Sequence, residues 1–126
     1  MTKAAQQQEC TQQRCCAGKH YFCSVELALQ VIGGKWKPII LWHLRTGDKL
    51  RFGELKRHMP NVTQKMLTQQ LRELESDGML LREVYAQIPP KVEYSLTGLG
   101  SSVMPILDQL SKWGMLFEAE HPGGAA

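Results

Sequence analysis

Polar side chains recur along residues 63–77 at the spacing of one helix face, and they could bind a polymer that is anionic and accepts hydrogen bonds. Arg and Lys side chains donate to guanine O6 and N7 or to phosphates, and Gln can bond an adenine edge through two atoms. The opposite face of the same segment is aliphatic, and it comprises Leu67, Leu71 and Leu74. The candidate binding residues are Gln64, Lys65, Thr68, Gln69 and Arg72.

Positive charge is concentrated in the same part of the chain. Residues 35–72 include nine Lys or Arg and two Asp or Glu, a net charge of +7, whereas residues 73–126 carry −5. The net charge of +3 for all 126 residues therefore hides a basic block beside an acidic one. A basic block within helical sequence is typical of proteins that bind DNA. The alternatives are a charged face that contacts only solvent, or one that binds an acidic protein surface.

Four thiols precede the first expected helix or adjoin it, and they could carry redox chemistry. The candidate redox-sensing residues are Cys10, Cys15, Cys16 and Cys23. Cys23 stands at a helix N-terminus, where the helix dipole favours a reactive thiolate; inert packing is the alternative. These cysteines and His20 could also bind zinc, but their spacing fits no paired C-x₂-C pattern. A disulfide between subunits needs no such geometry and is the preferred alternative, and no metal or cofactor is expected.

Local signals predict the elements that position these residues. Residues 24–32 form a helix with Ser24 as its N-cap, and Gly33-Gly34 ends it. The remaining elements are a helix from Pro38 to Gly47, a short strand at 49–52, a helix at 52–59, a helix at 63–77, a hairpin of 80–86 and 92–96, and a last helix capped by Thr97. Pro105 should kink that last helix.

Two short helices joined by a tight turn and followed by a hairpin predict a winged helix-turn-helix, an α+β fold that is mainly helical. Residues 52–59 would be the bracing helix, 63–77 the recognition helix and 80–96 the wing. Further DNA contacts are expected from Arg51 directly before the bracing helix, from Lys56 within it, and from Arg82 and Lys91 on the wing. The first and last helices carry enough apolar residues to be terminal dimerisation helices.

Composition limits the other possibilities. The chain should comprise a flexible Cys/Gln-rich arm at 1–19, a DNA-binding and dimerisation domain at 20–118, and a tail at 119–126. No apolar run is long enough to cross a bilayer and no signal peptide is visible, which predicts a cytoplasmic protein without a membrane partner. No nucleophile, phosphate-binding or metalloprotease motif is present, so an enzyme is not expected.

Five stretches of the sequence resemble the HxlR-type regulators, a MarR-related family of winged-helix transcription factors. They are residues 31–37 (VIGGKWK), 51–55 (RFGEL), 71–78 (LRELESDG), 89–97 (PPKVEYSLT) and 107–114 (LDQLSKWG). The resemblance implies a homodimer that binds a near-palindromic operator in double-stranded DNA. It also implies that Cys23 aligns with the thiol through which some members sense small oxidants or electrophiles, although Ser24 stands where members commonly have Pro.

We therefore expect a sequence-specific DNA-binding transcriptional regulator that acts as a repressor and responds to thiol chemistry. The alternative is a winged-helix module that binds an acidic protein partner.

Overall fold

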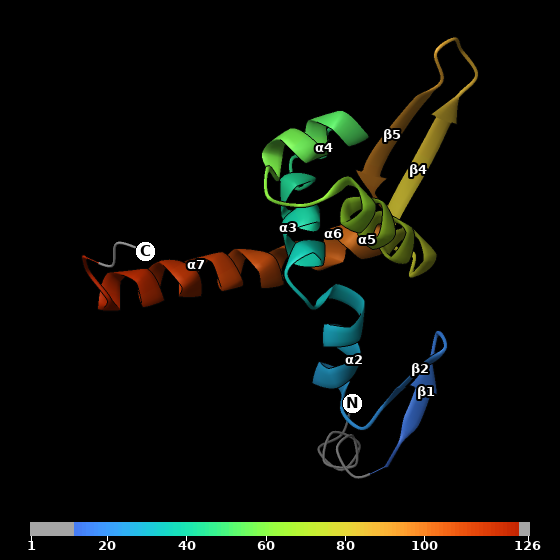
Figure 1. Cartoon of the computed structure of the whole chain (residues 1–126). Coiled ribbons are helices and arrows are strands. Elements are labelled where there is room, and N and C mark those ends of the chain that lie inside the picture. Colours follow the sequence, from blue (N-terminus) through green and yellow to red (C-terminus); the bar gives the residue numbers. More distant parts are fainter. Residues whose placement is uncertain (1–11, 124–126) are drawn as a thin grey trace.

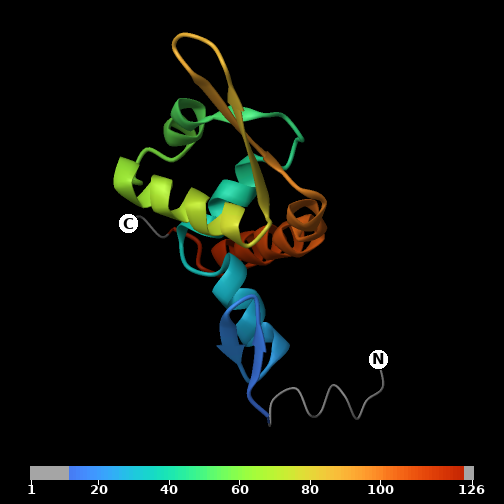
Figure 2. The same ribbon diagram turned by 90° about the vertical axis from the view of Figure 1, so that its right-hand side faces the viewer.

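The computed structural model describes residues 12–123, and it comprises a helical core with a hairpin projecting at each end (Figures 1 and 2). The elements in chain order are β1 (Arg14–Cys16), β2 (Lys19–Tyr21), α2 (Ser24–Ile32), α3 (Trp36–His43), β3 (Leu50–Arg51), α4 (Phe52–His58), α5 (Gln64–Ser76), β4 (Leu80–Tyr85), β5 (Lys91–Leu96), α6 (Gly98–Ser102) and α7 (Met104–Glu120). No helix within residues 12–123 is both long enough and apolar enough to span a bilayer.

Helix α5 follows the local signals of its sequence closely. The Thr63 side chain caps it by accepting a hydrogen bond of 3.0 Å from the Met66 N–H. Gly78 follows the helix with φ of +77°, a conformation that glycine adopts without strain. Between these ends the three leucines predicted to face inward are at most 1% exposed. They pack in a core with buried residues of α3, its C-cap and α4, namely Ile40, Leu41, Leu44 and Leu55.

Strands β4 and β5 form the predicted wing, and the short strand β3 pairs with β5 to give the order β3-β5-β4. The pairing is antiparallel and runs from Leu80 opposite Leu96 to Tyr85 opposite Lys91. Thr97 ties the base of the wing to the end of α5, because its hydroxyl donates to the Gly78 carbonyl at 2.6 Å. The same hydroxyl accepts from the Gly100 N–H at 3.0 Å and so caps α6, as predicted.

The C-terminal segment differs from the single kinked helix that the sequence predicted. It forms two helices, α6 and α7, separated at Val103, and Pro105 is the second residue of α7. Pro lacks an N–H and is favoured in the first turn of a helix, so it begins α7 instead of kinking a continuous helix. Helix α7 also continues to Glu120, two residues into the predicted tail.

The N-terminal region contains a hairpin that the sequence analysis missed. Strands β1 and β2 pair antiparallel, with Cys15 opposite His20. Tyr21 is buried, and the Gln30 side chain donates to the His20 carbonyl at 2.8 Å, which fixes β2 against α2. The expectation of an arm without regular structure is therefore wrong for residues 14–19, and residues 1–11 lie outside the described part. The N-cap of α2 is Cys23 and not Ser24 as predicted.

Helices α2 and α7 extend away from the core, α2 toward the N-terminal hairpin and α7 to one side (Figure 1). Helix α2 has no buried residue, and every residue of α7 from Asp108 onward is exposed. The large apolar side chains left exposed on these helices are Val25, Leu29, Ile106, Leu110, Trp113, Met115, Leu116 and Phe117.

Candidate nucleic-acid interface

The outward face of α5 brings the five predicted recognition residues together. Gln64, Lys65, Thr68, Gln69 and Arg72 line one open depression of about 580 Å³. Four of them are exposed and Thr68 is half-buried, and the Thr68 hydroxyl donates to the Gln64 carbonyl at 2.8 Å. The leucines on the other side of the helix prevent it from rotating, so this polar face points away from the core.

A second depression joins the end of α5 to the wing. Arg72 and Thr68 line it together with Glu75, Arg82 and Tyr94, so the Arg82 predicted to contact DNA lies beside the recognition helix. Arg82 and Tyr94 are paired across β4 and β5 and therefore share one face of the wing. This face continues the polar surface of α5 onto the wing.

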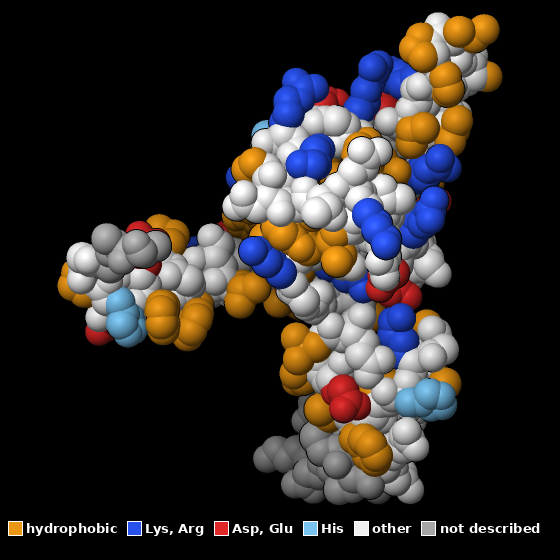
Figure 3. All heavy atoms as spheres, viewed as in Figure 1, with side chains coloured by type: hydrophobic (Ala, Val, Ile, Leu, Met, Phe, Trp, Pro, Cys, Tyr) orange, Lys and Arg blue, Asp and Glu red, His pale blue; other side chains and the backbone are white. Residues whose placement is uncertain are grey.

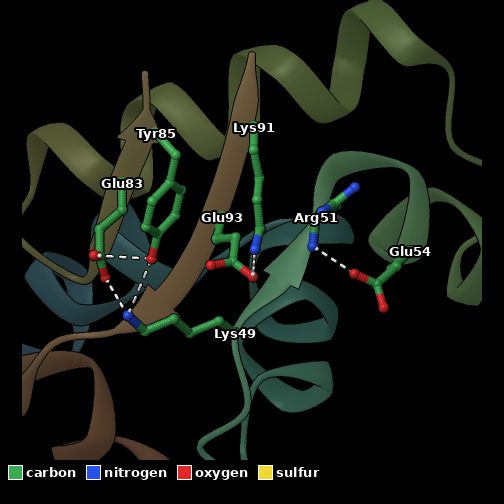
Figure 4. Close-up of polar contacts among 7 residues, drawn as sticks. All are labelled: Lys49, Arg51, Glu54, Glu83, Tyr85, Lys91 and Glu93. Carbon is green, nitrogen blue, oxygen red and sulfur yellow. Dashed lines mark hydrogen bonds and ion pairs between the residues drawn. The ribbon is translucent and has the colours of Figure 1, made fainter. Parts of the chain in front are cut away.

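Arg51 and Lys56 belong to the bracing helix α4, Arg51 at its N-cap and Lys56 within it. The side chain of Arg51 is exposed, whereas its backbone N–H donates to the Glu54 carboxylate at 3.0 Å and begins α4 (Figure 4). Lys56 is half-buried on α4. Figure 3 shows Lys and Arg side chains gathered over α4, α5 and the base of the wing, so the basic residues form one broad surface.

Not every cation of the basic block belongs to this surface. Lys37 is 7% exposed, and its ammonium lies 2.9 Å from Glu73, which joins α3 to α5. The hydrogen bond from Lys37 lowers the pKa of Glu73 below its ordinary value. Gln69, one helical turn before Glu73, contributes to the same lowering of the Glu73 pKa.

The base of the wing carries a second set of paired charges, on the face opposite Arg82. The Lys49 ammonium lies 2.7 Å from Glu83 and donates to the Tyr85 hydroxyl at 3.5 Å, and Tyr85 donates to Glu83 at 3.2 Å (Figure 4). The bond from Lys49 lowers the pKa of Glu83. Lys91 lies 3.8 Å from Glu93 and 5.0 Å from the centre of the Tyr85 ring. Lys91, predicted to contact DNA, therefore already has partners within the wing.

Sequence reasoning missed these pairs because their members are far apart along the chain. Lys37 and Glu73 are separated by 36 residues, and Lys49 and Glu83 by 34. The acidic residues of the second half of the chain neutralise part of the basic block, so its effective charge is lower than +7.

The thiols occupy two positions near the N-terminus. Cys23 is half-buried at the N-cap of α2, directly before the first helix as predicted. Cys15 and Cys16 are free and exposed on β1, and Cys10 lies outside the described residues. Within residues 12–123, no three His, Cys, Asp or Glu side chains come together in a way that could hold a metal ion.

A bracing helix, an exposed polar recognition helix and an antiparallel wing define the winged helix-turn-helix class of DNA-binding transcriptional regulators. The sequence model of the HxlR-like helix-turn-helix family matches residues 31–122, and the chain belongs to this family. It is therefore a transcriptional regulator and not an enzyme.

Three comparisons place the chain within the family. It is 64% identical over 96 residues to the HTH-type transcriptional regulator YtcD of Bacillus subtilis (strain 168), covering 76% of this chain and 75% of that one. The redox regulator HypR in its oxidised form is 57% identical with a TM-score of 0.71, covering 74% and 95%. The reduced transcriptional regulator YodB from B. subtilis is 31% identical with a TM-score of 0.66, covering 81% and 98%. HypR has also been solved in a reduced form, and YodB after diamide treatment.

Proposed function

We propose that this protein is a homodimeric repressor that binds a near-palindromic operator in double-stranded DNA. The observation that supports the proposal most directly is that α5 is amphipathic. Its leucines are buried, and its five polar residues line one open depression beside Arg82. A repressor of this kind would work where the chromosome lies, in the cytoplasm.

The side chains on this surface are assigned different tasks. Arg72 and Gln69 are the candidates for reading base edges in the major groove, because both are exposed on the outward face of α5. Lys65, Gln64 and Thr68 would contact bases or phosphates near the start of α5. Four more residues would contact the sugar-phosphate backbone of the DNA, namely Arg51, Lys56, Arg82 and Lys91. Lys91 should make the weakest contact, because it is already paired with Glu93.

Dimerisation supports the same proposal. The large apolar side chains of α2 and α7, including Trp113 at 60% exposure, are exposed together along each helix, and such groups mark protein–protein contacts. A two-fold dimer through these helices would set the recognition helices about 34 Å apart, one turn of DNA. Trp113→Glu should convert the dimer to a monomer in sedimentation velocity, whereas an unchanged sedimentation coefficient would exclude α7 from the interface.

The test of sequence-specific binding is a selection from a randomised duplex library, followed by anisotropy titrations on the selected and on a scrambled duplex. Arg72→Ala should cost about 1–3 kcal/mol on the selected duplex and relax its base preference. Lys56→Ala is the matched comparison, because loss of a phosphate contact weakens both duplexes alike. If Arg72→Ala also weakens both alike, Arg72 contacts phosphate; if no duplex is selected, the proposed function is wrong. Repression is tested by transcription in vitro from a promoter that contains the selected site.

We also propose that a thiol adjusts this binding. Cys23 occupies the N-cap position of α2, a helix of the proposed dimer interface, so a disulfide or adduct there would disturb the spacing of the two recognition helices. The likeness to HypR, described as a redox regulator, supports this proposal. Diamide should change the operator affinity of the wild type and of Cys15→Ser and Cys16→Ser, but not that of Cys23→Ser. A response to diamide that Cys23→Ser keeps in full would remove Cys23 as the sensor, and the variants Cys10→Ser, Cys15→Ser and Cys16→Ser would then identify which thiol replaces it.

A further inference from the structure

The far end of the wing is apolar, in contrast to the basic surface at its base. Ile88 is 100% exposed, and its neighbours Pro89 and Pro90 are exposed as well. The loop of residues 86–90 contains no Lys or Arg. Figure 3 shows hydrophobic side chains over this end of the wing, while the Lys and Arg side chains lie nearer the core.

The two faces of the wing differ in what they offer to DNA. Arg82 and Val84, two positions apart on β4, share the face of the wing that adjoins α5, and Val84 is 56% exposed. Glu83, Tyr85 and Lys91 point to the other face, where Lys49 and Glu93 complete the paired charges (Figure 4). The face that continues the recognition helix therefore runs from a cation at its base to aliphatic side chains at its tip.

We infer that the wing reads the minor groove beside each half-site with the apolar tip formed by Ile88, Pro89 and Pro90, and not with Lys91. This inference rests on the proposed function, because it requires α5 to lie in the adjacent major groove. With Arg82 at the level of the phosphates, the tip is the part of the wing that reaches farthest toward the bases. Proteins that bind the minor groove commonly insert Ile, Leu, Met or Pro there. Both prolines restrict the loop before it binds, which lowers the entropy lost on binding.

An apolar tip predicts a definite base preference. In the minor groove, A·T pairs present only acceptors, whereas a G·C pair adds the guanine N2 amino group. An isoleucine placed against that amino group would bury a donor with no acceptor. The pairs under the tip should therefore be A·T, and the discrimination should depend on the amino group alone.

The test varies that amino group without changing the major groove. A duplex selected by the wild type is resynthesised with A·T, G·C, inosine·C or 2,6-diaminopurine·T at each pair flanking the half-sites, and dissociation constants are measured by anisotropy. Inosine·C lacks the amino group and should bind like A·T. Diaminopurine·T carries it and should bind about tenfold more weakly, like G·C.

Variants of the wing link this preference to the tip. Ile88→Ala should weaken binding to the A·T duplex about tenfold, reduce the discrimination to about twofold, and leave the salt dependence unchanged because no cation is lost. Leu81→Ala is the matched control, since Leu81 is 49% exposed on the opposite face of the same hairpin, and it should behave like the wild type.

The inference is overturned if inosine·C binds like G·C, or if Ile88→Ala keeps the full discrimination of the wild type. In both cases the selected duplex still binds, so the proposed function stands. If the library yields no duplex at all, the proposed function and this inference fail together.

Discussion

The ion pair between Lys37 and Glu73 gives a prediction whose size follows from the structure. The Lys37 side chain is 9% exposed and lies 2.9 Å from the Glu73 carboxylate, which is 43% exposed. Glu73→Gln keeps the shape of the side chain but removes its charge. The ammonium of Lys37 would then be held in the core without a counter-charge, which is costly because a charge loses its hydration on burial.

The expected cost lies between two limits. Breaking a fully buried pair costs about 3–5 kcal/mol, whereas an exposed pair contributes about 0–1 kcal/mol. Because only one partner is buried here, Glu73→Gln should lower the free energy of unfolding by about 2 kcal/mol. For a chain of this length that corresponds to a fall in Tm of roughly 6–10 °C. Circular dichroism melts at one fixed protein concentration measure it, since a dimer's Tm depends on concentration.

Two further variants isolate the cause. Asp108→Asn breaks an exposed pair with Lys112, whose side chains are 53% and 65% exposed, and should change stability by less than about 0.5 kcal/mol. Adding Lys37→Met to Glu73→Gln removes the buried charge and should restore most of the loss. If Glu73→Gln is as harmless as Asp108→Asn, or if the double variant is no more stable than Glu73→Gln, the reasoning is wrong.

The same pair predicts a dependence on pH. Because Lys37 lowers the pKa of Glu73 in the folded protein, the unfolded chain binds the proton more readily. The stabilisation is therefore complete above the ordinary pKa of 4.5 and is lost as the pH falls through the lower folded value. The difference in stability between wild type and Glu73→Gln should be constant near neutrality and shrink below about pH 4.5 in urea titrations. A difference that grows on acidification would contradict this assignment.

Other predictions concern packing, capping and salt. Leu71→Ala should cost about 2–5 kcal/mol in urea titrations because a side chain 1% exposed would leave a cavity, and a cost below about 1 kcal/mol would contradict its place in the core. Gly100→Ala should cost about 3 kcal/mol, since a Cβ there would lie 2.1 Å from the Met79 carbonyl oxygen, and a wild-type Tm would show that the backbone yields. Thr63→Ala should cost about 1 kcal/mol and Thr63→Ser much less, because only the alanine variant loses the hydrogen bond from Met66. Operator affinity should fall roughly 10³–10⁵-fold between 50 and 200 mM salt, and a flat salt response would exclude phosphate contacts as its source.

The parts of the fold that the sequence predicted are those set by neighbouring residues. Helix α5 is an example: a threonine cap, three leucines at helical spacing and a following glycine define it within 16 residues, 63–78. The wing was predicted for the same reason, because a change to β-forming residues and a Pro-Pro loop lie within one short segment.

The parts that were missed depend on distant residues. The hairpin of residues 14–21 is held by Gln30 and by an ion pair of 3.1 Å between Lys19 and Asp77, the residue that ends α5. Nothing in the low hydrophobicity of residues 1–19 indicates these contacts. Lys37 was counted in the charge of the basic block, because its burial against Glu73 depends on how α3 packs on α5 and cannot be read from the sequence. Lys65, Gln69 and Arg72 were predicted to share the outward face of α5 with Thr68 on its flank. They line one depression together with Gln64, since helical spacing alone decides it.

Helix α7 begins directly after the junction with α6 at Val103 and projects from the core as a long helix. A helix of 17 residues is about 25 Å long, so a rotation of α7 by about 10° relative to α6 would displace its C-terminal end by about 4 Å. In the proposed dimer, α7 lies in the interface between subunits, and the recognition helix α5 belongs to the core at the other end of α7. A small rotation between the two α7 helices would therefore change the spacing of the two recognition helices by several ångströms, and that spacing would no longer match one turn of DNA.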